Sequence, residues 1–526
     1  MDVSNRIAHA QPNLPAGAHS STTARPTAFN NSHYGLVLRP RPVLTPDNPV
    51  QAHRHPFLDD GNLKASGQSV WEQDNSFSLN NSLILETGDK ADQVHISQTY
   101  SGQLDVRVNG QLYRFDSQDK DGKALTFHLK THGGNDNIRI DANVTQPVIV
   151  EAGDGNDRVQ AGAGYTRLFG GKGDDVLRLG SGLGYAEGND GDDTLIGGTG
   201  DNVMYGNNGN DRLYAGAGAK SKTSYLDGGN GKDLLYAGNG HTVLHGGPGD
   251  DRLIGHDRST FYTGSGCDKV IANRPGDRIY AQAGDTIKRL NGSVLTTVTT
   301  DQSSLVGFRI KGSADFIQRV EDDLALLRSS PQGKQMLAEM NAIALRNGAP
   351  VMLMEDRVDV GSGYVYGSQE LKALLQYERP PVVGDDPKWG FMVDGVPGSR
   401  ADRAEIIYNR SALNVLGAST YSPITTLYHE MVHAYNAGNG TALSGSTTET
   451  FEGEQHDVPN SERQAVGLPT TPATTPNPKP FTENALLEEM GKPLRTQYVG
   501  CPLAMLVCQP VTSHRPSCCM VRACRC

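Results

Sequence analysis

Two histidines and a glutamate stand at a spacing that suits metal chemistry. The pentapeptide is His429-Glu430-Met431-Val432-His433. On a helix, residues four apart lie on one face, one turn from each other, so both imidazoles can bind the same zinc ion. Glu430, beside the first histidine, is then placed to accept a proton from a water molecule that the metal activates. The pattern predicts a zinc hydrolase site with His429 and His433 as ligands and Glu430 as the general base.

The residues around this pentapeptide predict the helix that carries it. Ser422-Pro423 is a typical helix start, with serine as the N-cap and proline in the first turn. Apolar residues then recur at helical spacing as far as Tyr435, and Gly438 and Gly440 end the pattern. Before the helix, residues 404–409 alternate and are partly β-branched, which predicts a strand. A strand followed by a helix with HExxH is the core of a zincin. The alternative is a helix with two surface histidines.

A catalytic zinc needs a third protein ligand and an open position for water. Glu462 begins a second expected helix downstream of His433, where glutamate zincins carry their third ligand. His456 and Asp457 are rival ligands in a stretch that has the composition of a polar loop. We favour Glu462 because it belongs to a periodic segment. The alternative interpretation of Glu462 is an ordinary carboxylate at a helix N-terminus, where the helix dipole favours it.

The segment from about Gly312 to Tyr498 resembles the zinc protease effectors of bacterial type III secretion systems, the NleD-like peptidases. The matching pieces are Tyr428–Tyr435, Ser461–Pro469, Thr482–Leu486 and Pro493–Arg495. The resemblance implies an endopeptidase that cleaves proteins of a host cell. By match to the motif, it also implies that His429 and His433 are zinc ligands, Glu430 the general base and Glu462 the third ligand.

A peptidase also has to stabilise the oxyanion of its tetrahedral intermediate. Arg495 and Tyr498, three positions apart, could present a guanidinium and a phenol on one side of the site. Tyr435 is another candidate on the predicted zinc helix. Each of these residues could instead serve in packing or lie on the surface.

Glycine-rich hexapeptides that end in aspartate form the second chemical pattern. Clear copies are Gly170–Asp175, Gly228–Asp233 and Gly246–Asp251, and an apolar residue stands two positions after each terminal aspartate. This is the nonapeptide of RTX parallel β-rolls, in which glycines permit tight turns and carboxylates offer hard oxygen ligands to Ca²⁺. The candidate calcium ligands, including those of degenerate copies, are Asp157, Asp175, Asp193, Asp211, Asp233, Asp251 and Asp268.

The spacing of these aspartates predicts that the two edges of the roll differ. Asp157, Asp175, Asp193 and Asp211 recur every 18 residues, or once in two nonapeptides. Two nonapeptides make one turn, so one edge receives the carboxylates and we predict calcium along that edge only. Residues 220–224 are an extra segment that we interpret as a small loop inserted on the neutral edge. A flexible Gly/Asp-rich linker and a roll that folds without metal are the alternatives. The neutral residues at the matching position are Thr166, Gly184, Asn202, Thr242 and Thr260.

Composition divides the chain into five parts. We predict a disordered leader at 1–75, a β-rich cap at 76–150, the calcium roll at 151–290, an α+β zincin-like domain at 305–498, and a cysteine-rich tail at 499–526. The leader has no Sec-type hydrophobic region, and no apolar run is long enough to span a membrane. The net charge of −11 suits a cation-loaded protein and argues against nucleic-acid binding.

The tail holds six of the seven cysteines, all but Cys267. A metal knuckle with His514, a disulfide knot and acylated cysteines are possible functions for it. We favour an extension that does not fold, because the spacings match no metal signature.

Together these patterns predict a secreted bacterial Zn²⁺ endopeptidase with a Ca²⁺-binding roll, a monomer that acts on a host protein. Type III export is favoured over type I. A calcium-dependent surface or adhesion protein with a degenerate zincin domain is the competing hypothesis. Host cytosol would leave weak calcium sites empty, whereas extracellular calcium is about millimolar and would fill them.

Overall fold

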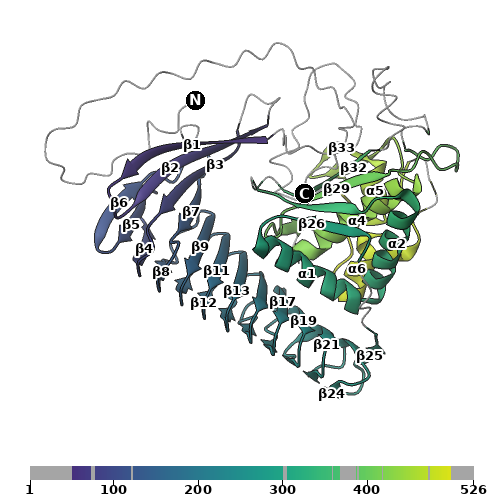
Figure 1. Ribbon diagram of the computed structural model, residues 1–526, viewed down its shortest axis with the longest axis horizontal. Helices are drawn as coiled ribbons and strands as arrows, with labels where there is room; N and C mark the ends of the chain where they lie inside the picture. The colour runs from purple at the N-terminus through teal and green to yellow at the C-terminus, as the bar shows by residue number, and fades with distance from the viewer. Residues whose placement is uncertain are drawn as a thin grey trace, which may run out of the picture.

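The computed structural model describes residues 50–498, apart from 73–77, 120–121, 300–304, 358, 360, 368–386, 388–389, 417–418, 472–473 and 475. Within them a long β-solenoid precedes a smaller α+β domain, which packs against one face of the solenoid (Figure 1). This confirms the predicted fold class. The leader up to residue 49 and the cysteine-rich tail lie outside the described residues.

Two antiparallel meanders cap the N-terminal end of the solenoid. One meander joins β1 (Val50–Asp59), β2 (Lys64–Glu72) and β3 (Ser78–Glu86). The other joins β4 (Gln93–Gln98), β5 (Leu104–Val108) and β6 (Gln111–Phe115). Strands β1 and β2 therefore lie before the predicted boundary at residue 75. Their polar sequence hides the strand pattern, and Pro56 sits at a register shift.

The solenoid is built from two long sheets whose strands alternate along the chain. From β7 onward every pairing within these sheets is parallel, and β3 and β4 of the cap join the same sheets through β7 and β8. One sheet contains β7 (Thr126–Lys130), β9 (Val148–Asp154), β11 (Thr166–Lys172), β13 (Gly184–Asp190), β15 (Asn202–Asn208), β17 (Thr223–Asn230), β19 (His241–Pro248), β21 (Arg258–Ser265), β23 (Arg278–Ala281) and β25 (Val294–Thr297). The other contains β8 (Asn137–Ile140), β10 (Arg158–Gln160), β12 (Val176–Arg178), β14 (Thr194–Ile196), β16 (Arg212–Tyr214), β18 (Leu234–Tyr236), β20 (Arg252–Ile254), β22 (Lys269–Ile271) and β24 (Thr286–Lys288).

The apolar residues of the repeat fill the interior of the roll, as predicted. The residue two positions after each aspartate belongs to a short strand of the second sheet and packs against aliphatic residues of the first, such as Leu168 and Met204. Each is at most 2% exposed: Val159, Leu177, Leu195, Leu213, Leu235, Leu253 and Val270. Burial of these side chains is what holds the two sheets together.

The neutral edge of the roll differs from its prediction at one position. Ser259, and not Thr260, pairs with Thr242, because this coil is one residue shorter than its neighbours. This edge also contains a lysine ammonium group. Lys222, from the inserted segment, donates from Nζ to the carbonyl oxygens of Gly198 and Ala215, each at 2.6 Å, and of Ala217 at 3.2 Å. An ammonium group here therefore satisfies turn carbonyls without a metal ion.

The C-terminal domain has a four-stranded sheet in the order β26-β27-β29-β28. Strands β26 (Phe308–Lys311), β27 (Val351–Glu355) and β29 (Arg403–Tyr408) are parallel, and the edge strand β28 (Gly363–Gly367) runs antiparallel to β29. The described helices are α1 (Ala314–Ser329), α2 (Pro331–Asn347), α4 (Pro423–Asn439), α5 (Asn460–Val466) and α6 (Glu483–Met490). Two hairpins complete the domain: β30 (Asn414–Leu416) with β31 (Ser419–Tyr421), and β32 (Ser446–Phe451) with β33 (Glu454–Pro459). The predicted strand and zinc helix are β29 and α4.

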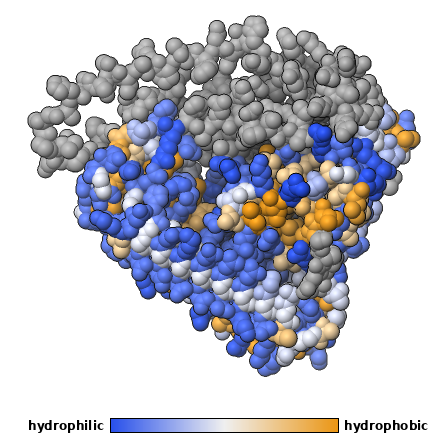
Figure 2. Space-filling model, viewed as in Figure 1, coloured by the Kyte–Doolittle hydropathy of each residue, from blue (hydrophilic) through white to orange (hydrophobic). Residues whose placement is uncertain are grey.

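The roll and the C-terminal domain share a core. Outward-facing tyrosines of the first sheet, among them Tyr185 and Tyr205, are fully buried against the domain. Arg319 of α1 is also fully buried, with its guanidinium carbon 3.1 Å from the centroid of the Tyr205 ring and Nη1 2.8 Å from Asp323. Elsewhere, in the view of Figure 2, the roll presents mainly hydrophilic residues, while apolar residues gather over the C-terminal domain. None of the described helices is long and apolar enough to cross a membrane.

Candidate metal centres

Helix α4 positions the two histidines of the pentapeptide. It starts after the N-cap Ser422 with Pro423 in its first turn, and ends at Gly440, whose left-handed conformation (φ 70°) closes the helix, as predicted. Gly438, by contrast, lies inside the helix and does not end it. A Cβ atom at position 438 would come within 2.6 Å of Ile343. Close packing of α4 on α2 therefore accounts for this glycine.

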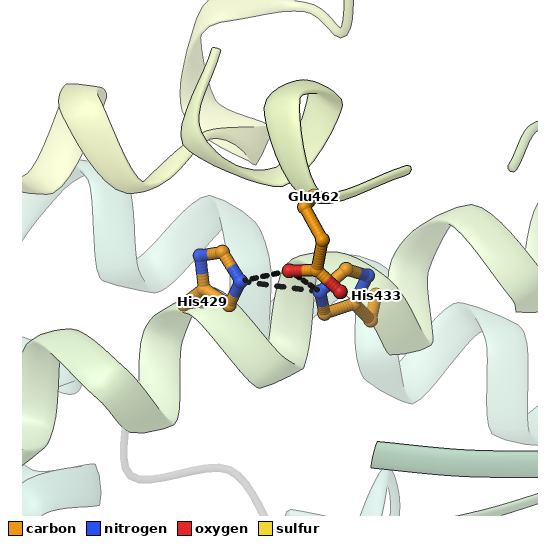
Figure 3. Close-up of side chains that lie close together, drawn as sticks. All are labelled: His429, His433 and Glu462. Carbon is orange, nitrogen blue, oxygen red and sulfur yellow. Dashed lines mark hydrogen bonds and ion pairs between the residues drawn. The ribbon is translucent and has the colours of Figure 1, made fainter. Parts of the chain in front are cut away.

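The ligand atoms of His429, His433 and Glu462 converge (Figure 3). Nε2 of His429 and Nε2 of His433 are 3.1 Å apart, and they lie 3.1 and 3.2 Å from Oε2 of Glu462. Donor atoms about 2.0–2.1 Å from a tetrahedral zinc lie roughly 3.3–3.4 Å from one another, so the spacing fits zinc. This is the one group of three or more His, Cys, Asp or Glu side chains found within metal-binding distance among the described residues.

The rival ligands lie elsewhere. His456 and Asp457 belong to strand β33 of a hairpin, where the sequence indicated a loop, and Asp457 accepts a hydrogen bond from Thr448 at 2.7 Å. Neither joins the convergent group. The hairpin leads directly into α5, whose first turn carries Glu462 and delivers it to α4. Of the three candidates for a third ligand, the structure brings only Glu462 to the histidines.

A second carboxylate contacts Nδ1 of His429, the ring nitrogen that faces away from Glu462. The sequence alone assigned this carboxylate no role. Nδ1 of His429 lies 2.8 Å from Oε2 of Glu483, the first residue of α6. Nη1 of Arg495 lies 2.9 Å from the same oxygen. A carboxylate on the outer nitrogen fixes the tautomer and orientation of a histidine ligand. Arg495 therefore reaches the site through Glu483, on the side of the ring opposite Nε2.

The tyrosines proposed for the oxyanion take different positions. The ring of Tyr498 lies beside His429, with the two ring centroids 6.3 Å apart. The backbone N–H of Tyr498 donates a hydrogen bond to the Glu449 carboxylate. Tyr435 points away from the histidines and stacks on Phe481 at 4.1 Å. A tyrosine that the sequence did not single out lies at a similar distance from the other imidazole. Tyr364 of β28 stacks on His433, with centroids 6.0 Å apart and planes inclined by 12°.

Electrostatics in this site follow from burial and from opposite charges. Burial opposes the ionised form of Glu462, but the adjacent His433 and His429 hold its pKa well below the usual range. Burial works against a charged His429, yet hydrogen bonds to Glu462 and Glu483 raise its pKa to about 10. Burial raises the pKa of Glu430 to about 7, which suits a general base near neutral pH. The pKa of the Tyr364 phenol is raised well above its ordinary value, chiefly by burial.

The aspartates of the repeat form a continuous ladder along one edge of the roll. The backbone N–H of Asp157 donates to Oδ1 of Asp175 at 2.7 Å, and the same bond recurs from coil to coil as far as Asp285. In each aspartate that donates this bond, Oδ2 is buried and has no hydrogen-bond partner: Asp157, Asp175, Asp193, Asp211, Asp233, Asp251 and Asp268. The ladder continues into the cap through Asp136 and Asp92, neither of which was among the predicted calcium ligands.

The chemistry of this edge fits a divalent cation. A Cβ atom at Gly188 would come within 2.1 Å of Oδ2 of Asp193 and within 2.8 Å of the Gly206 carbonyl oxygen, so glycine leaves room for two oxygens to converge. Calcium takes such carboxylate and carbonyl oxygens as ligands. Burial raises the pKa of Asp211 and Asp251 to about 9. In the cap, Thr131 stands at the place of this glycine, five residues before Asp136.

Comparison with known protein families agrees with both halves of the structure. Residues 306–498 match Peptidase_M91, an effector protein family, which confirms the resemblance to NleD-like peptidases. Residues 151–184, 187–219 and 227–257 match the RTX calcium-binding nonapeptide repeat. No curated protein and no solved structure gave a match. The C-terminal domain is therefore an effector peptidase domain behind calcium-binding repeats, and the two matches support a secreted effector protease.

Proposed function

We propose that this protein is a zinc-dependent endopeptidase, exported by a bacterium as an effector, that cleaves a protein of a host cell. The observation that carries the proposal is the convergence of His429, His433 and Glu462 beside the fully buried Glu430, within a domain that matches effector peptidases. Type III export is the route we favour. The roll would bind Ca²⁺ along the aspartate ladder and support the peptidase through their common core.

The side chains of the site can divide the work of peptide hydrolysis. His429, His433 and Glu462 would hold the zinc ion, which supplies a Lewis acid for the scissile carbonyl and lowers the pKa of bound water to about 7. Glu430 accepts the proton of the attacking water and passes it to the leaving amine. Glu483 keeps Nε2 of His429 directed at its partners. Neither oxygen of Glu430 is engaged by another described residue, so its carboxylate is available for this transfer.

The experiment is a comparison of host-cell lysates treated with the wild-type chain and with Glu430→Gln, reading out new protein N-termini by mass spectrometry. Wild type should create a small set of new termini. Glu430→Gln should slow their appearance by about 10²–10⁴-fold, because it keeps the ligands but removes the base.

Glu488→Gln is the matched control, because Glu488 is exposed on α6 and its carboxylate pairs only with Lys479 among the contacts described. It should behave as wild type. Indistinguishable lysates from wild type and Glu430→Gln would refute the proposed peptidase activity.

A further inference from the structure

Among the buried polar groups of the described chain that have no hydrogen-bond partner, two belong to residues next to His433. Both carboxylate oxygens of Glu430 are buried without a hydrogen bond, and so is the hydroxyl oxygen of Tyr364. Glu430 is fully buried and Tyr364 is 3% exposed. Folded proteins leave few such groups unsatisfied, and each exception calls for an explanation, of which a catalytic role is one. Glu430 has such a role in the proposed function, whereas Tyr364 has none.

The sheet places Tyr364 beside the metal ligands. Strand β28 is the edge strand of the four-stranded sheet and pairs only with β29 among the described strands, so its other edge faces away from the sheet. The Tyr364 ring lies nearly parallel to the His433 ring, at 6.0 Å between centroids. Glu430 precedes His433 by three positions on α4, so the two residues are neighbours on the helix surface. Tyr364, His433 and Glu430 therefore belong to one small region of the site.

The other candidates for an oxyanion donor are placed less well. The Arg495 guanidinium binds Glu483 and the backbone carbonyl of Tyr498, each at 2.9 Å. The guanidinium thus lies on the Nδ1 side of His429, away from Nε2. Tyr498 lies on the His429 side, with its ring tilted by 39° to that imidazole. Tyr364 differs from both because its ring stacks on His433 and its hydroxyl is buried without a partner.

We propose that Tyr364 is a catalytic residue whose hydroxyl donates a hydrogen bond to the oxyanion formed when water adds to the scissile carbonyl. This role rests on the proposed peptidase function. In the step, the water oxygen bonds to the carbonyl carbon, the carbonyl π electrons move to oxygen, and Glu430 takes the water proton. Tyr364 keeps its own proton and only donates the hydrogen bond. When the C–N bond breaks, Glu430 returns its proton to the amine and the carbonyl forms again.

The test uses the full chain, with host-cell lysate as the substrate source and the new termini made by wild type as the readout. Tyr364→Phe should slow their appearance by about 10²–10³-fold, the range for loss of one oxyanion donor. Its zinc content should equal that of wild type. Its melting temperature should be unchanged or higher, because the substitution removes a buried hydroxyl that has no partner. Tyr366→Phe, two residues along the same strand and stacked on Tyr364, is the control and should cleave at the wild-type rate.

Each outcome decides the role of Tyr364. A rate for Tyr364→Phe within threefold of wild type would overturn it, as would a slow rate that comes with a lower melting temperature or lost zinc, which indicates a structural role. If Tyr498→Phe loses activity while Tyr364→Phe keeps it, the donor is Tyr498. If wild type itself makes no new termini relative to Glu430→Gln, the peptidase function fails first, and that result is separate from a failure of Tyr364 alone.

Discussion

The cluster of His429, His433 and Glu462 and the aspartate ladder both bury carboxylates, with opposite consequences for their pKa values. Glu462 and Asp211 are both 1% exposed. The pKa of Glu462 is held far below its usual range by two imidazoles, whereas burial, assisted by the charges of Asp233 and Asp193, raises the pKa of Asp211 to about 9. Burial alone therefore does not decide whether a carboxylate is ionised, because the charge of its neighbours can reverse the effect.

This difference predicts different dependence on metal. In the cluster of His429, His433 and Glu462, a positive His429 can balance the carboxylates when no metal is bound, so this cluster does not need a metal ion to neutralise its charge. Along the ladder the buried Oδ2 atoms of the described aspartates have no hydrogen-bond partner, and neighbouring aspartates add to the negative charge. These carboxylates need protons or calcium. The neutral edge carries no such column of carboxylates, and at one of its turns Lys222 donates to backbone carbonyls.

The largest effect should come from removing calcium at pH 8. Two sites loaded at 100 times their Kd would together contribute about 5 kcal/mol, and a domain of this size changes its Tm by about 2–4 °C for each kcal/mol. Thermal melting in calcium-free buffer that still contains zinc should therefore show a Tm lower by roughly 10–20 °C. An equal Tm with and without calcium would show that the roll folds without metal.

The same treatment should slow the peptidase, because the roll holds α6. Tyr262 donates to Oε1 of Glu489 at 2.9 Å and Thr260 donates to the Met490 carbonyl at 2.8 Å, both at the end of the helix that begins with Glu483. Circular dichroism of the full chain titrated with calcium, together with the cleavage rate, will show whether both change at the same concentration. A half-transition far above micromolar would exclude a calcium role in host cytosol.

The calcium-free protein should also lose stability as the pH rises. Burial raises the pKa of Asp175 to about 8 and that of Asp233 to about 7, above the value of about 3.8 expected in an unfolded chain. A folded chain with raised pKa values binds protons more tightly than the unfolded chain. The stabilisation is thus complete below about pH 4 and is lost progressively as the pH rises to about 8. Calcium-free melts should give a higher Tm at pH 5.5 than at pH 8.5, and added calcium should remove the difference.

A smaller change is expected from the group that orients the zinc ligand. Glu483→Gln weakens the contact to Nδ1 of His429 and leaves Arg495 without its carboxylate. Loss of such an outer partner typically weakens metal affinity by about 10–100-fold. Competition with a zinc chelator should show this, with Glu488→Gln on the exposed side of the same helix as the control. If both variants bind zinc alike, Glu483 has no part in ligand orientation.

Local patterns predicted much of this molecule because they encode local geometry. The spacing of His429 and His433 and the helix start at Ser422 are properties of single segments, and α4 has both. Residues whose roles depend on contacts distant in sequence were missed. Tyr364 looks like an ordinary strand residue until β28 is placed beside α4, and Asp136 lies outside the repeat pattern although it continues the ladder.

Errors of register have a similar cause. Thr260 was predicted on the neutral edge, but one coil is a residue shorter, so Ser259 takes that place and Thr260 contacts α6 instead. In a strand, a shift of one residue turns a side chain to the opposite face. The repeat pattern also could not predict the core that the roll shares with the C-terminal domain. The outward-facing tyrosines of this core do not recur at a fixed position of the repeat.

The most direct test of the central claim is elemental analysis of the purified full chain together with Glu462→Gln and Asp211→Asn. Wild type should contain one zinc ion and several calcium ions per chain. Glu462→Gln should lose most of the zinc and keep the calcium, whereas Asp211→Asn should keep the zinc and hold less calcium. Full zinc occupancy in Glu462→Gln would contradict the assignment of the metal centre to His429, His433 and Glu462.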